Sequence, residues 1–157
     1  MYKRQVHPDG RGAGVWVRRS KNVRIDGIVV SQLPIGQCDS VELTNVKSIS
    51  YYGWGDGMDV FSSSNVILDG VFCRNSDDCT AVYASTQGFK GGSNNVLVKN
   101  ATLWADVAHP INIGGHGDPN GMDTVQNVTF RNIDILDQAE KQIDYQGCLA
   151  INPGDNT

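Results

Sequence analysis

The chain has 157 residues and a formal net charge of −4 at neutral pH, with a sequence pI near 5.2. An acidic chain lacks the basic face that nucleic acid requires, so we expect no nucleic-acid partner. No stretch approaches the length and apolarity of a membrane span, so we expect no membrane partner either.

Residues 1–5 resemble a translated sequencing adapter, and we leave them out of the fold prediction. Residues 6–157 are predicted to form one domain segment. The repeat pattern described next runs to both ends with no capping element, which indicates a piece of a longer protein that is inactive by itself.

A short cassette recurs along the chain. An Asn or Ser is followed by alternating apolar and polar residues and then by Asp-Gly or Asn, which is the pattern of a strand. The cassettes begin at Asn22, Ser40, Asn65, Asn95 and Asn127. Second short apolar runs lie between them, at residues 14–17, 58–61, 80–83, 111–113 and 148–151. No segment carries a helical stripe.

Two or three short strands per repeat, joined by polar turns, predict one coil of a parallel β-solenoid. The competing fold is an antiparallel sandwich, whose hairpins would use turns such as Asp26-Gly27 and Asp69-Gly70. Because the strand recurs as a whole cassette, we favour the solenoid, an all-β fold.

Acidic residues and a histidine start three successive repeats. Asp56 and Asp59 lie in Trp54-Gly-Asp-Gly-Met-Asp, the pair Asp77-Asp78 precedes Cys79, and His109 opens His-Pro-Ile-Asn-Ile-Gly. Asp56 and Asp77 are about one coil apart, as are Asp78 and His109 once an inserted loop is counted. Equivalent strands of neighbouring coils lie about 4.8 Å apart, so these side chains are expected to share one groove.

Clustered carboxylates repel one another, which favours a protonated acid beside an ionised base. Cleavage of a glycosidic bond needs that division of roles. Two other interpretations stay open: each Asp could be an ordinary turn residue, or the group could ligate calcium.

The order of these motifs resembles glycoside hydrolase family 28, the polygalacturonase-type right-handed parallel β-helices, over residues 22–136. The resemblance implies that Asp77 is the general acid, that Asp56 and Asp78 hold the attacking water, and that the anomeric centre inverts. The Asn-Thr that precedes the first family Asp is replaced here by Trp54-Gly55.

The family histidine sits in Gly-His-Gly, as His116 does here, but the apolar continuation of that motif follows His109. We therefore assign the tuning role to His109 and expect His116 to line the cleft. Asp59, Trp54 and Tyr52 are further candidates for contact with the sugar, because aromatic faces stack on sugar rings. Trp104 is a weaker candidate, since it lies inside an apolar run.

The family also carries an Arg-Ile-Lys that binds the uronate carboxylate, and this chain has none. The glycan could therefore be pectic or neutral. The resemblance implies a monomer that acts on a polysaccharide or oligosaccharide, needs no cofactor or metal, and is extracellular or periplasmic. The alternative is a β-helical carbohydrate-binding or adhesin module, and a polysaccharide lyase is less favoured because no Lys or Arg lies within the motifs.

The four cysteines lack the paired spacing of a zinc site. We expect Cys38, Cys73, Cys79 and Cys148 to be buried as small apolar side chains. A disulfide between Cys73 and Cys79 is left open.

Overall fold

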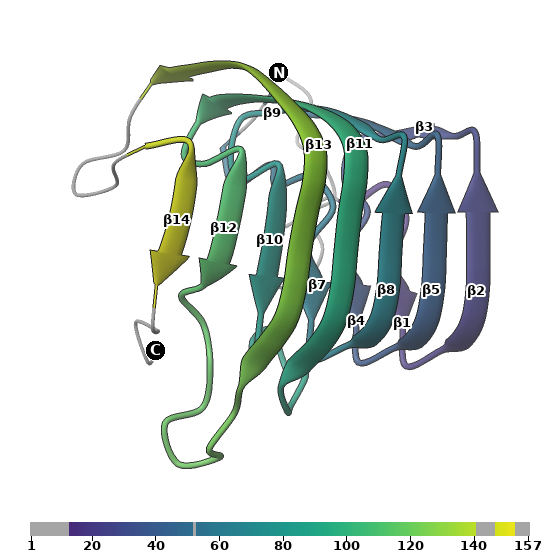
Figure 1. The fold of residues 1–157 in the computed structure, drawn as a ribbon, viewed down its shortest axis with the longest axis vertical. Coiled ribbons are helices and arrows are strands. Elements are labelled where there is room, and N and C mark those ends of the chain that lie inside the picture. Colours follow the sequence, from purple (N-terminus) through teal and green to yellow (C-terminus); the bar gives the residue numbers. More distant parts are fainter. Residues whose placement is uncertain (1–12, 52, 141–146, 153–157) are drawn as a thin grey trace, which may run out of the picture.

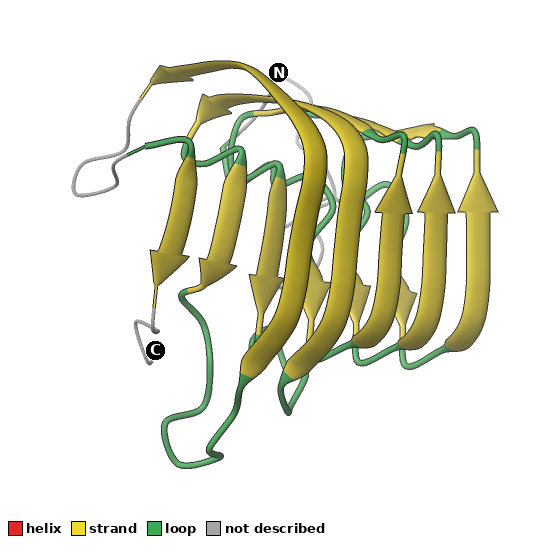
Figure 2. Ribbon diagram, in the orientation of Figure 1, coloured by secondary structure: helices red, strands yellow, loops and turns green. Residues whose placement is uncertain are grey.

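The structure, a computed structural model, describes residues 13–51, 53–140 and 147–152. Every regular element in these ranges is a β-strand, and loops make up the rest (Figure 2). The described ranges therefore hold no helix that could cross a membrane.

The chain winds in successive coils that contribute strands to two sheets (Figure 1). Sheet A contains, in spatial order, β1 (Val17–Arg18), β4 (Ile35–Gly36), β7 (Val60–Phe61), β10 (Thr80–Tyr83), β12 (Ile111–Gly114) and β14 (Leu149–Asn152). Sheet B contains β2 (Lys21–Asp26), β5 (Asp39–Thr44), β8 (Ser64–Asp69), β11 (Ser93–Val107), β9 (Phe72–Asn75), β6 (Lys47–Ile49) and β3 (Val29–Val30), and β13 (Val125–Glu140) pairs with β11.

All named strand pairs are parallel. The predicted parallel β-solenoid is thus confirmed, and the antiparallel sandwich is wrong. The described residues contain one isolated antiparallel bridge, between Thr86 and Phe89. The pattern missed β4, whose run Leu33-Pro-Ile-Gly36 is broken by a proline and a glycine.

Each cassette is bounded by two residues with left-handed backbone, five positions apart, with φ between 52° and 71°. The first set is Asn22, Ser40, Asn65, Asn95 and Asn127, and the second is Gly27, Asn45, Gly70, Asn100 and Asn132. Gly and Asn adopt this conformation most readily, which explains why the cassette opens on Asn and closes on Gly or Asn.

The bounding asparagines also donate hydrogen bonds to side chains of neighbouring coils. Asn100 Nδ2 donates to Asp69 Oδ1 at 2.7 Å, and Asn132 Nδ2 donates to Asn100 Oδ1 at 2.8 Å. Asn95 Nδ2 donates to Asn65 Oδ1 at 2.7 Å on the other side of the cassette. The asparagines therefore hold neighbouring coils in register.

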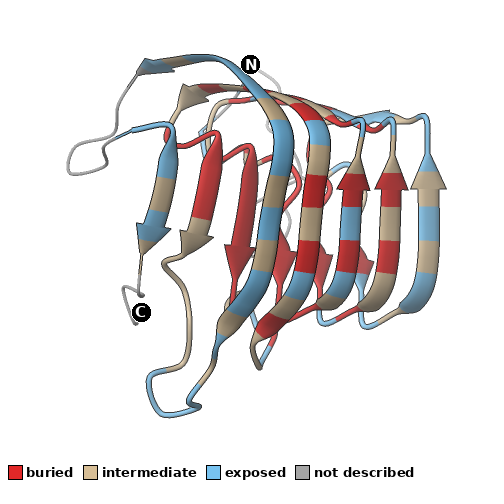
Figure 3. Ribbon diagram, in the orientation of Figure 1, coloured by how far each residue is buried: buried red, intermediate tan, exposed pale blue. Residues whose placement is uncertain are grey.

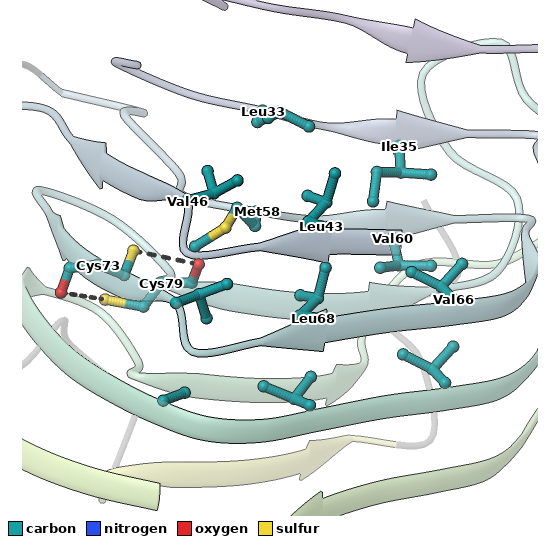
Figure 4. Close-up of a cluster of buried hydrophobic side chains, with 14 of the residues drawn as sticks. Leu33, Ile35, Leu43, Val46, Met58, Val60, Val66, Leu68, Cys73 and Cys79 are labelled. Atoms are coloured by element: carbon teal, nitrogen blue, oxygen red, sulfur yellow. Dashed lines mark hydrogen bonds between the residues drawn. The ribbon is translucent and has the colours of Figure 1, made fainter. Parts of the chain in front are cut away.

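The core consists of identical positions stacked from coil to coil. Val41, Val66 and Val96 are register partners, and Leu43 and Leu68 are another pair. All are fully buried (Figure 3), and each such side chain contributes about 1.5–3 kcal/mol of burial free energy. Figure 4 shows the stack between the two sheets.

Three of the cysteines belong to this core, as predicted, but Cys148 is exposed, so the prediction is wrong for that residue. Cys73 and Cys79 are free thiols. Cys73 Sγ donates to the carbonyl of Cys79 at 3.3 Å, and Cys79 Sγ donates to the carbonyl of Cys73 at 3.7 Å (Figure 4). Burial raises the pKa of the Cys73 thiol well above its ordinary value, so the pair packs as an apolar unit.

Candidate active site

The three acidic and histidine motifs lie at the starts of three adjacent strands of sheet A. Gly57 N donates to the carbonyl of Asp78 at 2.7 Å, and Cys79 N donates to the carbonyl of His109 at 2.9 Å. In a parallel ladder these bonds place Asp56 opposite Asp78 and Asp78 opposite His109. Three predicted site residues thus occupy one position on three successive coils.

The register differs in one detail from the sequence prediction. We expected Asp56 to pair with Asp77, but the step from β7 to β10 is that from Val60 to Val82. This step brings Asp78, not Asp77, opposite Asp56, and Asp77 lies one residue earlier. Spacing alone missed this because the coils differ in length: the previous step runs from Ile35 to Val60 and the next from Thr80 to Ile111.

Asp78 is 5% exposed and is held at both oxygens. Its Oδ2 accepts from Tyr83 Oη at 2.7 Å and from Asn112 Nδ2 at 2.8 Å. Its Oδ1 accepts from the His109 backbone N–H at 2.9 Å. Burial raises the pKa of Asp78, but the hydrogen bonds from His109, Asn112 and Tyr83 outweigh it, so the pKa lies below its ordinary value. Asp78 is therefore an ionised carboxylate in the fold.

His109 is 1% exposed, and its Nδ1 lies 3.4 Å from Asp78 Oδ1. Its backbone makes two bonds to the neighbouring coil, since its N–H donates to Asp78 and its carbonyl accepts from Cys79. His109 thus fixes the Asp78 carboxylate through ring and backbone together.

Asp77 and Asp56 are only partly buried, so both remain accessible. Asp77 Oδ1 accepts from the Asp78 backbone N–H at 3.0 Å. The turn before Asp56 is held by Asn75, whose Nδ2 donates to the carbonyls of Gly55 at 2.9 Å and Asp56 at 2.7 Å. The buried side chain of Asn75 therefore positions the first motif.

Gly57 has no room for a side chain. A Cβ there would collide with the carbonyl oxygen of Cys79 and with Cys73 Sγ. The glycine after Asp56 thus lets the first motif approach the Asp77-Asp78 turn closely, over the cysteine pair.

Asp59 and Asp56 line the same small gap on the outer face of sheet A. Asp59 is 1% exposed, and its Oδ1 accepts from the backbone N–H of Ala81 at 3.2 Å. This contact holds β7 to β10.

His116 packs edge-on against the ring of Tyr83, with centroids 4.7 Å apart, which places it one ring away from Asp78. Trp54 is 70% exposed two residues before Asp56. Tyr52 lies outside the described residues.

Sequence reasoning missed Tyr83, Asn112 and Asn75. Burial raises the pKa of Tyr83 well above its ordinary value, and the Asp78, Asp59 and Asp56 carboxylates raise it further, so the phenol stays protonated and donates. The only sequence signal was a polar residue inside an apolar run, as Asn112 is in Ile-Asn-Ile.

The weaker sugar candidate lies elsewhere. Trp104 is in β11 of sheet B, where the guanidinium of Arg74 lies 4.3 Å from its ring centroid. Arg131, the first arginine after His109 in the chain, is in β13 opposite Lys99 and is therefore also on sheet B.

Within the described residues no group of three or more His, Cys, Asp or Glu is arranged to hold a metal ion. The carboxylates instead take their contacts from backbone N–H groups, amides and a phenol. This arrangement suits proton transfer and positioning of a water more than cation binding.

Comparison with known proteins adds an independent observation. The family described as glycosyl hydrolases family 28 matches residues 13–141. No solved structure matches the chain significantly.

Exopolygalacturonase X of Aspergillus niger is 30% identical over 126 residues, which cover 80% of this chain and 24% of that protein. An exopolygalacturonase of Cochliobolus carbonum is 34% identical over 86 residues, 54% of this chain and 17% of that protein. A probable endo-xylogalacturonan hydrolase A of Aspergillus fumigatus is 34% identical over 85 residues, 54% of this chain and 18% of that protein.

This chain therefore spans 17% to 24% of the length of these relatives. The matched residues contain the parallel coils, the Asp77-Asp78 turn and the His109 strand. The chain belongs to glycosyl hydrolases family 28.

Proposed function

We propose that the protein is an inverting glycoside hydrolase that cleaves a pectin-type polysaccharide, with Asp77 as general acid and Asp56 and Asp78 as the residues that activate water. The observation that carries this proposal is the register of Asp56 with Asp78 on adjacent coils, with the accessible Asp77 beside them. Two kinds of carboxylate, one held ionised and one accessible, are what the reaction requires.

The chemistry assigns each proton. Asp77 donates its carboxyl proton to the glycosidic oxygen as the bond from that oxygen to the anomeric carbon breaks. Water attacks the anomeric carbon from the opposite face, and its proton passes to the carboxylate of Asp78 or Asp56. The new C–O bond has inverted configuration, and exchange with solvent restores both protonation states.

The lowered pKa of Asp78 supports its role as the base, since a carboxylate that stays ionised can accept the proton from water. His109, Asn112 and Tyr83 would hold the orientation of this carboxylate. His109 is thus a positioning residue, whose ring faces Asp78 instead of the substrate.

The names of the relatives support a pectic substrate. Trp54 is exposed next to Asp56 and offers a face for a sugar ring. A polymer of this kind lies outside the cell, so we place the protein in the extracellular space or the periplasm, as a monomer that needs no cofactor.

The test is Asp77→Asn in the full-length protein, assayed by reducing-end release from polygalacturonic acid. Removal of a general acid lowers the rate by about 10²–10⁴-fold, while the unfolding midpoint should stay unchanged because the Asp77 side chain is partly exposed. Asp134→Asn, on the exposed side of β13, is the matched control and should keep full activity.

Full activity of Asp77→Asn would remove the hydrolase proposal. NMR of the first anomer formed tests the inverting outcome separately. A native protein that binds the polymer without releasing reducing ends would favour the alternative, a carbohydrate-binding module.

A further inference from the structure

A thiol and an amide lie together on the inner face of β9, beneath the first acidic motif. Cys73 and Asn75 are two residues apart in this strand, so their side chains point to the same face. Both are 0% exposed. A Cβ on Gly57 would collide with Cys73 Sγ, so the sulfur lies against the backbone that follows Asp56. These two side chains therefore separate the apolar core (Figure 4) from the site.

The amide of Asn75 fits in only one of its two orientations. Its Nδ2 donates to the carbonyls of Gly55 at 2.9 Å, Asp56 at 2.7 Å and Ser31 at 3.3 Å. Turning the amide over would bring Oδ1 against these carbonyl oxygens, which cannot donate to it. Oδ1 must therefore face the other way, toward Cys73.

The thiol of Cys73 supplies the hydrogen bond that this oxygen needs. Cys73 Sγ lies 2.8 Å from Asn75 Oδ1 and is its only donor among the residues that the structure describes. Burial raises the pKa of the thiol well above its ordinary value, so the sulfur keeps its proton. The second acceptor within reach, the carbonyl of Cys79 at 3.3 Å, already accepts from the Met58 N–H at 2.9 Å. The proton on this sulfur thus favours the orientation of the amide that holds the first motif.

We propose that Cys73 is a positioning residue of the hydrolytic site, whose thiol proton orients the Asn75 amide so that the amide holds Asp56 where it activates water. Cys73 is buried beneath the backbone of the site, so it acts through Asn75 and not on the sugar. The active protein must then carry Cys73 as a free thiol, because a disulfide to Cys79 would remove the proton. This inference rests on the proposed hydrolase function and adds a residue to the part of the site that activates water.

Kinetics of the full-length protein on polygalacturonic acid test the role of the thiol proton. Cys73→Ala removes the donor, and Cys73→Ser replaces it with a hydroxyl that can donate. We expect kcat of Cys73→Ala to fall about 10–100-fold, since small displacements of a reacting group cost rates of this order. KM should stay within about twofold of the native value, because the change leaves the sugar contacts in place. Cys73→Ser should recover most of kcat, although a buried hydroxyl has no advantage in burial over a methyl group.

Cys38→Ala is the matched control for the loss of a buried thiol. Cys38 is another free thiol of the core, and its Sγ donates to the carbonyl of Gly36 at 3.3 Å, away from Asn75. This variant should lower the unfolding midpoint and keep the native kcat, with every kcat measured well below the midpoints. A folded Cys73→Ala protein with native kcat would overturn the inference. So would a folded Cys73→Ser protein that is no more active than Cys73→Ala.

Mapping of the thiols in the active native protein is a second test that needs no variant. Trypsin cuts after Arg74, which lies between Cys73 and Cys79, so the two cysteines fall in separate peptides. After unfolding, alkylation and digestion without a reducing agent, mass spectrometry should find Cys73 alkylated in a peptide of its own.

A Cys73 peptide joined through a disulfide in the active protein would overturn the inference and leave the hydrolase function standing. This result decides even if neither Cys73 variant folds. A native protein that releases no reducing ends at all would remove the hydrolase function, and this inference with it.

Discussion

Tyr83→Phe should lower the free energy of unfolding without changing the shape of the site. The substitution removes the hydroxyl that donates to Asp78 Oδ2 at 2.7 Å and leaves the ring stacked on Phe61. A hydrogen bond to a charged group contributes about 1.5–3 kcal/mol. Because Asp78 is 5% exposed, water replaces little of this loss. We expect the free energy of unfolding at neutral pH to fall by about that amount.

The loss in the free energy of unfolding caused by Tyr83→Phe should depend on pH. The pKa of Asp78 in the fold lies below its ordinary value, so its ionised form stabilises the protein above that ordinary value. This stabilisation disappears as the pH falls through the pKa of the folded state. The difference between native protein and Tyr83→Phe should therefore be largest at neutral pH and shrink in acid. The acid limb of the activity profile should move to higher pH, because the variant holds the Asp78 proton more tightly.

Urea unfolding of the full-length protein at several pH values measures both effects. Tyr51→Phe is the matched control, because Tyr51 is 88% exposed, and surface changes of this kind usually stay within about 0.5 kcal/mol. The reasoning fails if Tyr83→Phe is no less stable than Tyr51→Phe at neutral pH, or if its deficit persists unchanged in acid.

Three more outcomes can be measured. Asn100→Ala should lose about 2–4 kcal/mol in urea unfolding, from two side-chain hydrogen bonds and a left-handed backbone; Asn100→Gly should lose less, and equal losses would contradict the backbone cost. Gly57→Ala should lower both the unfolding midpoint and the activity, because its Cβ meets Cys79 and Cys73; unchanged activity would show that the motifs tolerate separation. The 157-residue chain alone should self-associate in light scattering, because Ile135, Leu136, Leu149 and Ile151 are exposed; a monodisperse monomer would contradict this.

The strand cassettes could be predicted because they depend on local chemistry. Alternating apolar residues mark the strands of sheet B, and Asn or Gly marks the left-handed positions at their ends. The short strand β4 could not be predicted, because two residues carry no periodicity. It forms because hydrogen bonds run from Leu33 N to the Gly57 carbonyl and from Ile35 N to the Asp59 carbonyl, on the next coil.

The candidate site also contains residues that could be predicted from the sequence and residues that could not. The motif residues Asp56, Asp78 and His109 could be named from their order in the chain. The partners of Asp78 could not, since Tyr83 and Asn112 read as ordinary members of strands β10 and β12. Their role comes from the lateral stacking of coils, and a register error of one residue is enough to pair Asp56 with the wrong neighbour.

The constant interval between the paired left-handed positions has a consequence for how such a chain tolerates change. In all five cassettes this interval is the same, whereas the turns that join the two sheets differ in length, and residues 84–92 between β10 and β11 form one of the longer ones. Insertions in those turns can reshape the mouth of the groove without disturbing the stack. A single deletion between Asn65 and Gly70, such as that of Ile67, would instead put Val66 and Leu68 on opposite faces of the sheet and break the stack at one of them.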